Sequence, residues 1–380
     1  MALPVWGEIL LILYAVAVVL FQGLAILYAV RMPSLLPTDP IVPQSGTGVG
    51  VVIPARNEAE DLPSCLDGLL AQEFVPQAIT VVDGGSTDAT AEVARARSPR
   101  VHLVTEPPLP SGWVGKNWAC SVGSQVTPGE FLLFTDADMR YVPATLRVGV
   151  GWAQRESADL VSLAPRVEMV GFWERVVLPF MTQLILTYFR APSVNRDTSR
   201  AAMANGQFLL VRRSSYEAVG GHAAVRGAVL EDVALARKFR GSGLHLRIAW
   251  APELLVTRMY RTRKEMDEGL LKNLHGTKFS ALRQLGFLAG LVALFWLPFA
   301  LLPVGLIEGS AVVAAVGAFL WVILFVKHAE FTRAVGGRRR DGLLFPVAVG
   351  YYAWLFLRSV VNGLSRRAVT WKGRTYSFER

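Results

Sequence analysis

The stretch Phe131-Leu-Leu-Phe-Thr-Asp136-Ala-Asp138 is an apolar run that ends in two carboxylates on alternate positions. Side chains at positions i and i+2 of a strand point to the same side of a sheet, so we expect the two acids to converge where the strand stops. Two converging carboxylates suit a divalent cation, Mn²⁺ or Mg²⁺, and such a cation clamps a diphosphate. For an isolated pair of this kind an ordinary acidic turn is the better interpretation, so the surrounding chain decides.

The stretch belongs to a series of strands that alternate with helices. Strands are expected at 49–53, 79–83, 101–105 and 130–135. One helix is expected at 59–72, and a second follows the turn at 84–88 and ends at 97. The alternation predicts an α/β fold with a mostly parallel sheet, helices on both faces and right-handed crossovers. Ligands of such sheets bind beyond the carboxyl ends of the strands. The polar residues expected at that edge are Asn57, Glu58, Asp83, Asp136 and Asp138.

Apolar runs outside this series predict membrane-spanning helices. Uncharged stretches of 22 residues lie at 9–30 and 286–307, and one of 17 residues lies at 310–326. A spanning helix needs about 20 apolar residues, so the first two are expected to span and the third is at the lower limit. The run 342–357 could span, re-enter or lie in the interface, and the last two are favoured because a further span would place the basic tail outside. The shorter run 176–189 is expected to form a helix lying on the membrane.

The charge is uneven along the chain. The net charge is +9, and residues 332–380 hold ten Lys or Arg against two acids, a net +8. Because basic residues that flank apolar spans are expected on the cytoplasmic side, nucleic acid is not needed to explain them. Anionic lipid headgroups or a phosphorylated ligand fit the basic tail better. Arg31 follows the first apolar run and no Lys or Arg precedes it, which places the following domain in the cytoplasm. Cys65 and Cys120 have no metal-type spacing, and no disulfide is expected.

The expected domain layout follows from these patterns. It comprises a transmembrane anchor (1–31), a Pro/Gly-rich linker (32–48), a cytoplasmic α/β domain (49–280) with an interfacial helix near 172–190, a C-terminal membrane region (281–363) and a basic tail (364–380). No G-x-G-x-x-G motif opens the first helix and no P-loop motif occurs, which disfavours dinucleotide-binding and P-loop enzymes.

The order of motifs resembles the membrane-bound family-2 glycosyltransferases with a GT-A fold. The residues that carry this resemblance are Val-Val-Ile-Pro-Ala-Arg-Asn-Glu (51–58), Val-Val-Asp-Gly-Gly-Ser-Thr-Asp (81–88), the acids at 136–138 and Leu230-Glu231-Asp232. Four further segments are similar to the branch that glycosylates carotenoid acids and hopanoid-type lipids. They are Gly112-Trp-Val-Gly-Lys116-Asn-Trp-Ala, Ala204-Asn205-Gly-Gln207-Phe, Gly220-Gly-His222 and Trp371-Lys-Gly-Arg374-Thr-Tyr.

The resemblance implies roles for matching positions. Asp83 would contact the nucleoside of a nucleotide sugar, with a UDP-sugar as the first expectation, and Asp136 and Asp138 would hold Mn²⁺ or Mg²⁺. Asp232 would be the general base of an inverting transfer, and its place at an expected helix start also suits an ordinary acid. Further donor-side candidates are Asn57, Glu58, Lys116, Arg258 and Arg261, the two arginines being expected on one helical face. Acceptor-side candidates are Asn205, Gln207, His222 and Glu231; Trp371 and Arg374 would meet the diphosphate or lipid headgroups.

Two features depart from the family pattern. Gly84 stands where a second acid is common, and the segment Thr257-Arg258-Met-Tyr-Arg261 lacks the tryptophan that often follows the base. The expected function is therefore transfer of a sugar from a nucleotide sugar to a membrane lipid at the cytoplasmic membrane. A polysaccharide synthase, a polyprenyl-phosphate glycosyltransferase and a non-catalytic nucleotide-sugar-binding scaffold remain as alternatives. A transporter is disfavoured because the acidic motifs lie outside the spans.

Overall fold

The computed structural model describes residues 4–97, 99–277, 279–364, 369–371 and 374–376, the last few of these, from 363 onward, by their backbone alone. The chain folds into two compact units. The α/β unit comprises residues 31–168 and 189–259. The helical unit comprises residues 1–30, 169–188 and 260–380.

The α/β unit is built on a seven-stranded sheet with the order β3-β2-β1-β4-β8-β6-β9. Its strands are β1 (Val49–Ala55), β2 (Ala78–Asp83), β3 (Val101–Thr105), β4 (Phe131–Phe134), β6 (Leu160–Ala164), β8 (Leu209–Arg212) and β9 (Leu246–Trp250). β1 pairs in parallel with β2 and with β4, whereas β8 runs antiparallel to β4 and to β6. A second sheet has the order β5-β10-β7, formed by β5 (Met139–Tyr141), β10 (Leu255–Thr257) and β7 (Arg166–Val167).

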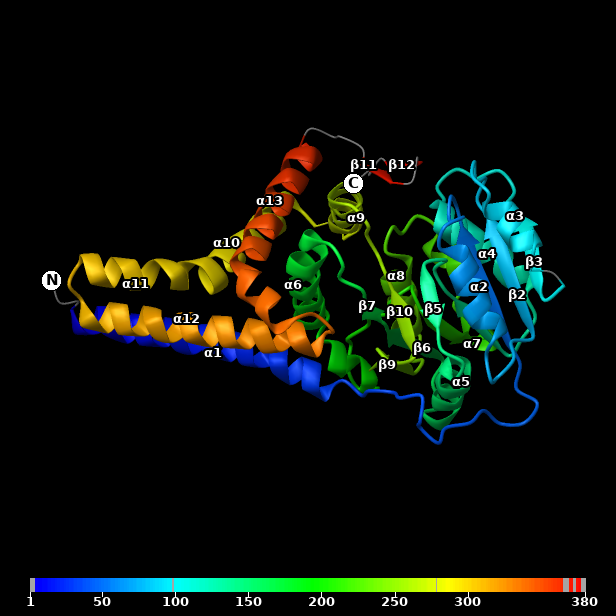
Figure 1. Cartoon of the computed structure of the whole chain (residues 1–380), viewed down its shortest axis with the longest axis horizontal. Helices are drawn as coiled ribbons and strands as arrows, with labels where there is room; N and C mark the ends of the chain where they lie inside the picture. Colours follow the sequence, from blue (N-terminus) through cyan, green and yellow to red (C-terminus); the bar gives the residue numbers. More distant parts are fainter. Residues whose placement is uncertain (1–3, 98, 278, 365–368, 372–373, 377–380) are drawn as a thin grey trace. The chain divides into compact units, whose positions relative to one another are not determined.

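Helices of the α/β unit connect the strands and cover the sheet (Figure 1). They are α2 (Leu62–Leu70), α3 (Thr90–Arg95), α4 (Gly115–Val126), α5 (Thr145–Arg155), α7 (Arg213–Ala218) and α8 (Glu231–Gly241), with single 3₁₀ turns at η1 (Ala191–Asn195) and η2 (Gly221–Val225). The core between the layers is aliphatic, and side chains such as Ile53, Leu66 and Leu133 are fully buried there. Continuous apolar strands of this kind are expected where both faces of a sheet are covered.

The mostly parallel α/β sheet predicted from the sequence is confirmed, with two differences. β8 is antiparallel, because it enters the sheet beside β4 after a long excursion rather than through a βα crossover. The first helix begins at Leu62 rather than at 59, and Pro63 occupies its first turn, where a proline lacks only an N–H that would have no helical partner. The expected linker is also ordered: Leu35 N donates to the carbonyl of Trp250 at 2.8 Å, extending the edge beside β9.

Gly123 on α4 allows the helix to approach the sheet closely. A Cβ at this position would lie 2.4 Å from Val52 Cγ1 and 2.9 Å from Val82 Cγ2, which belong to β1 and β2. We expect Gly123→Ala to lower the free energy of unfolding by about 1–3 kcal/mol, the usual effect of overpacking a tight core. Thermal unfolding of the purified protein measures this. Gly241→Ala, at a glycine whose Cβ would meet nothing within 4 Å, is the matched control, and equal unfolding of the two variants would contradict the close approach.

The helical unit contains the apolar helices. Its elements are α1 (Val5–Arg31), α6 (Phe172–Phe189), α9 (Arg263–Gly276), α10 (Ala281–Leu291), a π-helical turn η3 (Val292–Trp296), α11 (Leu297–Ile307), α12 (Ala311–Ala334), a 3₁₀ turn η4 (Arg339–Leu344), α13 (Phe345–Leu364) and the hairpin β11 (Val369–Trp371) and β12 (Arg374–Tyr376). Among the described residues, four helices are long and apolar enough to cross a membrane, at Val5–Arg31, Ala281–Ile307, Ala311–Ala334 and Arg339–Asn362. The fourth joins η4 to α13 and covers the run that could span, re-enter or lie in the interface.

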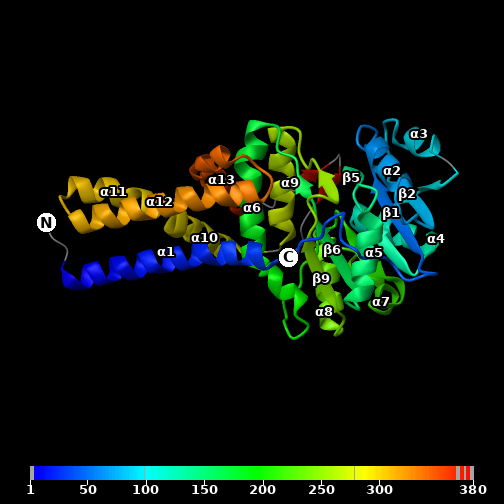
Figure 2. The same cartoon turned by 60° about the horizontal axis from the view of Figure 1, so that its bottom comes forward.

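Close packing joins these helices to one another. α11 and α12 lie side by side in both views (Figures 1 and 2), and Ala15 and Val18 of α1 form a buried cluster with Leu320 of α12. α11 and α12 approach so closely that a Cβ on Gly317 would lie 2.4 Å from the backbone nitrogen of Leu302. Small residues at such contacts are typical of helix pairs in membranes, where close backbone approach drives association.

α6, the helix expected to lie on the membrane, packs against other helices of its unit. Its residues Val177 and Leu178 are fully buried, and Phe180 contacts the rings of Phe295 and Tyr352. The apolar face of α6 is therefore covered by helices of the same unit. The prediction rested on the short apolar run and on the charged Glu174 and Arg175 before it. A sequence pattern does not tell a lipid-facing apolar face from one covered by protein.

Candidate active site

The acids after β4 lie at the carboxyl edge of the large sheet. β4 ends at Phe134, and Asp136 and Asp138 follow in the turn that leads to β5. The turn, rather than the strand alternation expected from the sequence, therefore sets the direction of the two carboxylates. Thr135 Oγ1 donates to the carbonyl of Gln207 at 2.7 Å, which ties this turn to the segment that enters β8.

Lys116, in the first turn of α4, joins acids from two other elements. Its Nζ lies 2.6 Å from Asp136 Oδ1 and 2.8 Å from Glu231 Oε1. Burial lowers the pKa of Lys116, but the carboxylates of Asp136 and Glu231 outweigh it, and the net pKa is well above its ordinary value. The ammonium group therefore stays charged. A Cβ on Gly206 would lie 3.0 Å from Lys116 Nζ, so a glycine at this position leaves room for the cluster.

Asp232 lies beside this cluster at the start of α8. Its Oδ2 accepts from Gly206 N at 2.8 Å and its Oδ1 from Val233 N at 2.7 Å. Burial and the neighbouring charge of Glu231 raise the pKa of Asp232 to about 6, and Lys116 and the two N–H donors oppose that rise. A carboxylate with a pKa near the working pH is suited to general base catalysis.

The raised pKa of Asp232 predicts an acid limb in the pH dependence of the reaction. A general base works only when ionised, so kcat/KM is expected to rise with pH through about 6 and to level off above it. Initial rates between pH 5 and 8, at saturating metal, measure this limb. A profile that stays flat from pH 5 to 7 would contradict the assignment of the base to this carboxylate.

Two loops at the ends of β1 and β2 are joined by hydrogen bonds. Asp83 Oδ1 accepts from Ser86 N at 3.1 Å and from Ser86 Oγ at 2.5 Å. Asn57 adopts φ 55°, a left-handed conformation that asparagine tolerates, and its Oδ1 accepts from Thr87 N at 2.8 Å. The N–H of Glu58 donates to Thr90 Oγ1 at 2.8 Å. Asn57 thus shapes the loop beside Asp83, which is 7% exposed.

The expected acceptor-side residues fall into two groups. Gln207 is buried. Its Oε1 accepts a hydrogen bond from Asn205 Nδ2 at 2.9 Å, and its Nε2 donates to Thr257 Oγ1 at 3.4 Å. His222 is 1% exposed and packs against Phe134, so it is a core residue rather than the surface histidine that its residue type suggests. Burial and the charge of Lys116 lower the pKa of His222 to about 3, so the ring is neutral.

Thr257 is a site residue that the motifs did not identify. It ends β10, is fully buried, and its Oγ1 donates to Asp138 Oδ2 at 3.2 Å. Thr257 therefore links Gln207 to the carboxylate of Asp138. Only the pairing of β10 with β5, at Thr257 and Met139, brings this residue to the acids, and a pairing between distant segments leaves no local sequence pattern.

The two arginines expected on one helical face do not lie on a helix. Arg258 and Arg261 fall between the end of β10 and the start of α9, in a segment without regular secondary structure. Arg258 belongs to the α/β unit and Arg261 to the helical unit. Trp371 and Arg374 are directly paired in the hairpin of β11 and β12, and their side chains lie outside the described residues, as do Lys372 and Gly373.

The acids at 136 and 138 fit a divalent cation of the kind expected. In the described ranges, no group of three or more His, Cys, Asp or Glu side chains is arranged to hold a metal ion by itself. Mg²⁺ and Mn²⁺ in nucleotide sites are usually held by one or two carboxylates together with substrate phosphates, so two carboxylates suffice. Asp136 and Asp138 would supply these ligands, and Lys116 would then be released from Asp136 toward the phosphates.

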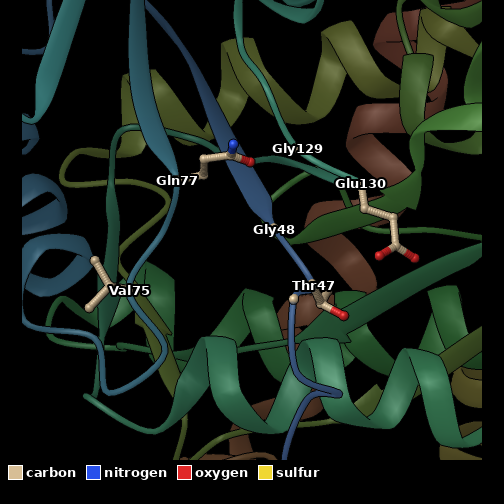
Figure 3. A pocket seen from close by; sticks show the side chains of 7 residues that line it. Thr47, Gly48, Val75, Gln77, Gly129 and Glu130 are labelled. Carbon is tan, nitrogen blue, oxygen red and sulfur yellow. The ribbon is translucent and has the colours of Figure 1, made fainter.

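A separate pocket of about 490 Å³ lies at the opposite edge of the sheet (Figure 3). Gly48, Gln77 and Glu130, which precede β1, β2 and β4, line it together with Gly46, Thr47, Val75 and Gly129. It shares no residue with the acidic cluster. It therefore provides positions for control substitutions within the α/β unit.

The α/β unit is similar in sequence to known glycosyltransferases. Residues 50–220 match the glycosyl transferase family 2 model. The chain is 29% identical over 231 residues to a 4,4'-diaponeurosporenoate glycosyltransferase from Staphylococcus haemolyticus, an alignment that covers 60% of each protein. It is 24% identical over 346 residues to the enzyme of the same name from Staphylococcus aureus (strain USA300), covering 87% of this chain and 88% of that one.

One solved structure resembles nearly the whole chain. It is a mannosyltransferase from Pyrobaculum calidifontis in complex with GDP-Man and Mn²⁺, with a TM-score of 0.53 and 18% sequence identity. The match covers 94% of this chain and 99% of that one. The likeness shows that the chain has a GT-A-type fold with additional apolar helices.

Proposed function

We propose that this chain, a glycosyltransferase with a family 2 domain at residues 50–220, is an inverting, metal-dependent enzyme that moves a sugar from a nucleotide sugar to a membrane lipid. The observation that supports this best is the cluster at the carboxyl edge of the sheet. There Lys116 contacts both Asp136, a metal-ligand candidate, and Glu231, the neighbour of the base candidate Asp232.

The chemistry assigned to the cluster is a single displacement. An acceptor oxygen forms a bond to the anomeric carbon while the bond from that carbon to the diphosphate oxygen breaks, and the diphosphate leaves with the electron pair. Asp232 accepts the proton of the acceptor, and the anomeric configuration is inverted because attack comes from the face opposite the leaving group. A divalent cation at Asp136 and Asp138 would neutralise charge on the departing diphosphate. Lys116, permanently charged and adjacent to Asp136, would add a second cation there.

Donor recognition is assigned to the loops after β1 and β2. Asp83 is held toward this edge by Ser86, and Asn57 fixes the neighbouring turn. We assign the nucleoside to Asp83, with Glu58 beside it and a UDP-sugar as the expected donor. Arg258, directly after β10, is assigned to the phosphates because a guanidinium group binds phosphate in a bidentate fork.

The acceptor is assigned to the lipid class because the described part of the chain contains four helices long and apolar enough to cross a membrane. The Staphylococcus relatives are named for a carotenoid acid, diaponeurosporenoate, and we propose a carotenoid, hopanoid or other isoprenoid lipid for this chain. The α/β unit would face the cytoplasm, where nucleotide sugars are found, at the cell membrane. Asn205, Gln207 and Glu231 would form the acceptor side of the site.

The test uses purified protein in detergent with UDP- and GDP-sugars. We expect Mn²⁺- or Mg²⁺-dependent release of nucleotide from one donor, stimulated by isoprenoid lipid extract, and a lipid product whose anomeric configuration is opposite to that of the donor. Release stimulated only by polyprenyl phosphate would identify the polyprenyl-phosphate enzyme instead. A polymeric product would identify a synthase, and donor binding without turnover in the presence of all lipids would leave a binding scaffold.

A further inference from the structure

Lys327 is a buried cation inside one of the apolar helices. It lies in α12, within a candidate membrane span, and is 5% exposed. Its ammonium group donates to Gln183 Oε1 of α6 and lies 5.2 Å from the centre of the Phe331 ring. Both contacts are with uncharged groups. An ionisable side chain within a span is costly to bury, and such residues usually mark a binding or transport function.

The hydrogen bonds from Lys327 continue to a third helix. Gln183 Nε2 donates to Gln22 Oε1 of α1 at 3.4 Å, and Gln22 and Gln183 are each 1% exposed. The relay ends at Gln22 Nε2, a buried donor that has no hydrogen-bond partner in the described chain. α1, α6 and α12 thus contribute one residue each to this relay, which starts at the ammonium group and ends at the amide donor of Gln22.

Two further unpartnered polar atoms lie around Phe180 of α6. His328 and Tyr352 are 4% and 5% exposed, and their rings lie 6.1 Å and 5.6 Å from the ring of Phe180. His328 Nε2 and Tyr352 Oη have no hydrogen-bond partner within the residues that the structure describes. Buried polar atoms in native proteins are nearly always paired, so this set calls for a ligand or water.

The acids of the helical unit do not supply the missing charge. Asp341 pairs with Arg175, Glu330 with Arg333 and Asp267 with Tyr351. Across the described ranges no ion pair is found to Lys327. A lysine ammonium, an amide N–H and a phenol O–H are all donors, and their complement is an anionic oxygen group carried on an apolar body. His328 adds no donor, because its Nδ1 already donates to the carbonyl of Leu324.

We propose that Lys327, Gln183 and Gln22 form a binding site for the anionic head of an apolar amphiphile, a carboxylate or a phosphate, within the helical unit. Tyr352 would supply a further hydrogen bond through its hydroxyl group. The site goes beyond the proposed transfer reaction, since it requires neither donor nor metal. If this site does not bind an anion, the proposed transfer reaction is unaffected. If the transfer reaction is not found, the binding site can still be measured by itself.

The test is equilibrium binding to the full chain in neutral phosphatidylcholine nanodiscs, without nucleotide sugar or metal. The probes are a fluorescent long-chain polyene acid, parinaric acid, and its methyl ester. We expect the acid to bind at least tenfold more tightly than the ester, and Lys327→Met to lower its affinity at least tenfold with the ester unchanged. Lys327→Arg should retain most of the preference, because it keeps the charge.

Arg333→Met is the matched control, since Arg333 lies on the same helix with a side chain 67% exposed. It should bind the acid as wild type does. If Lys327→Met fails to fold, Gln22→Leu provides the second variant and should weaken the acid severalfold. If phosphatidylglycerol displaces the acid, the occupant of the site is a lipid phosphate. If it does not, the occupant is a free apolar acid. Equal binding of acid and ester, binding of neither, or unchanged binding by the folded variants would overturn the site.

Discussion

Replacement of Asp232 by asparagine is expected to lower kcat about 10²–10⁴-fold, the range that removal of a general base produces. Asp232 accepts from Gly206 N and Val233 N with different oxygens, and asparagine keeps only one of them, so the start of α8 should lose one hydrogen bond and otherwise stay folded. Asparagine cannot take the acceptor proton. Donor binding should therefore be retained, and the loss should appear in turnover. Initial rates with lipid acceptor, beside calorimetric binding of donor and Mn²⁺, separate the two.

Two matched variants accompany this prediction. Glu231→Gln removes a neighbouring acid that contacts Lys116 at 2.8 Å, and should mainly disturb that lysine. Asp67→Asn removes an exposed acid that pairs with Arg97 and should leave the rate unchanged. If Asp232→Asn turned over at more than a tenth of the wild-type rate, the base would lie elsewhere. Loss of donor binding in the same variant would instead assign Asp232 to the donor side.

β1, β2 and β4 of the large sheet were predictable because they are almost entirely buried, whereas β3 was recognised although it lies at the sheet edge and is partly exposed. Apolar runs at 49–53, 79–83 and 101–105 match β1, β2 and β3 to within two residues at either end. The direction of β8 was not predictable, since an apolar strand has the same pattern whichever way it runs. The packing of α6 against other helices was not predictable either, because a sequence shows which residues are apolar but not what they pack against.

The acidic residues of the site could be predicted from the sequence, but the ion pairs and hydrogen bonds among the site residues could not. Carboxyl ends of parallel strands meet at one edge, which is why Asp83 and Asp136 were expected near each other. The ion pair of Lys116 with Glu231 and the hydrogen bond of Thr257 to Asp138 join segments more than 100 residues apart, and no local pattern encodes them. Arg258 and Arg261 were placed on a helix from their i,i+3 spacing, a spacing that two residues alone also show in a loop.

Replacement of Asp138 by asparagine is expected to lower kcat/KM about 10²-fold or more, because a catalytic cation supplies several kcal/mol of charge stabilisation. Unlike the change at Asp232, this one should weaken binding of Mn²⁺ in the presence of nucleoside diphosphate. Asparagine can still accept a hydrogen bond from Thr257 Oγ1, so the turn after β4 should remain folded. Mn²⁺ binding followed by electron paramagnetic resonance, with and without the diphosphate, measures the effect directly.

Thr257→Val tests whether the orientation of Asp138 matters as well as its charge. Valine removes the hydroxyl that donates to Asp138 Oδ2 while keeping the shape, and a hydrogen bond to a charged group corresponds to about tenfold or more in affinity. Thr47→Val, at the opposite edge of the same sheet, removes a hydroxyl bonded to Gln154 and serves as the control (Figure 3). The wild type and Thr47→Val should bind Mn²⁺ with equal affinity. Thr257→Val should bind it more weakly, and Asp138→Asn most weakly of the four. The same affinity in all four would place the cation away from Asp138, whereas a loss confined to Asp138→Asn would mean that its charge alone holds the metal.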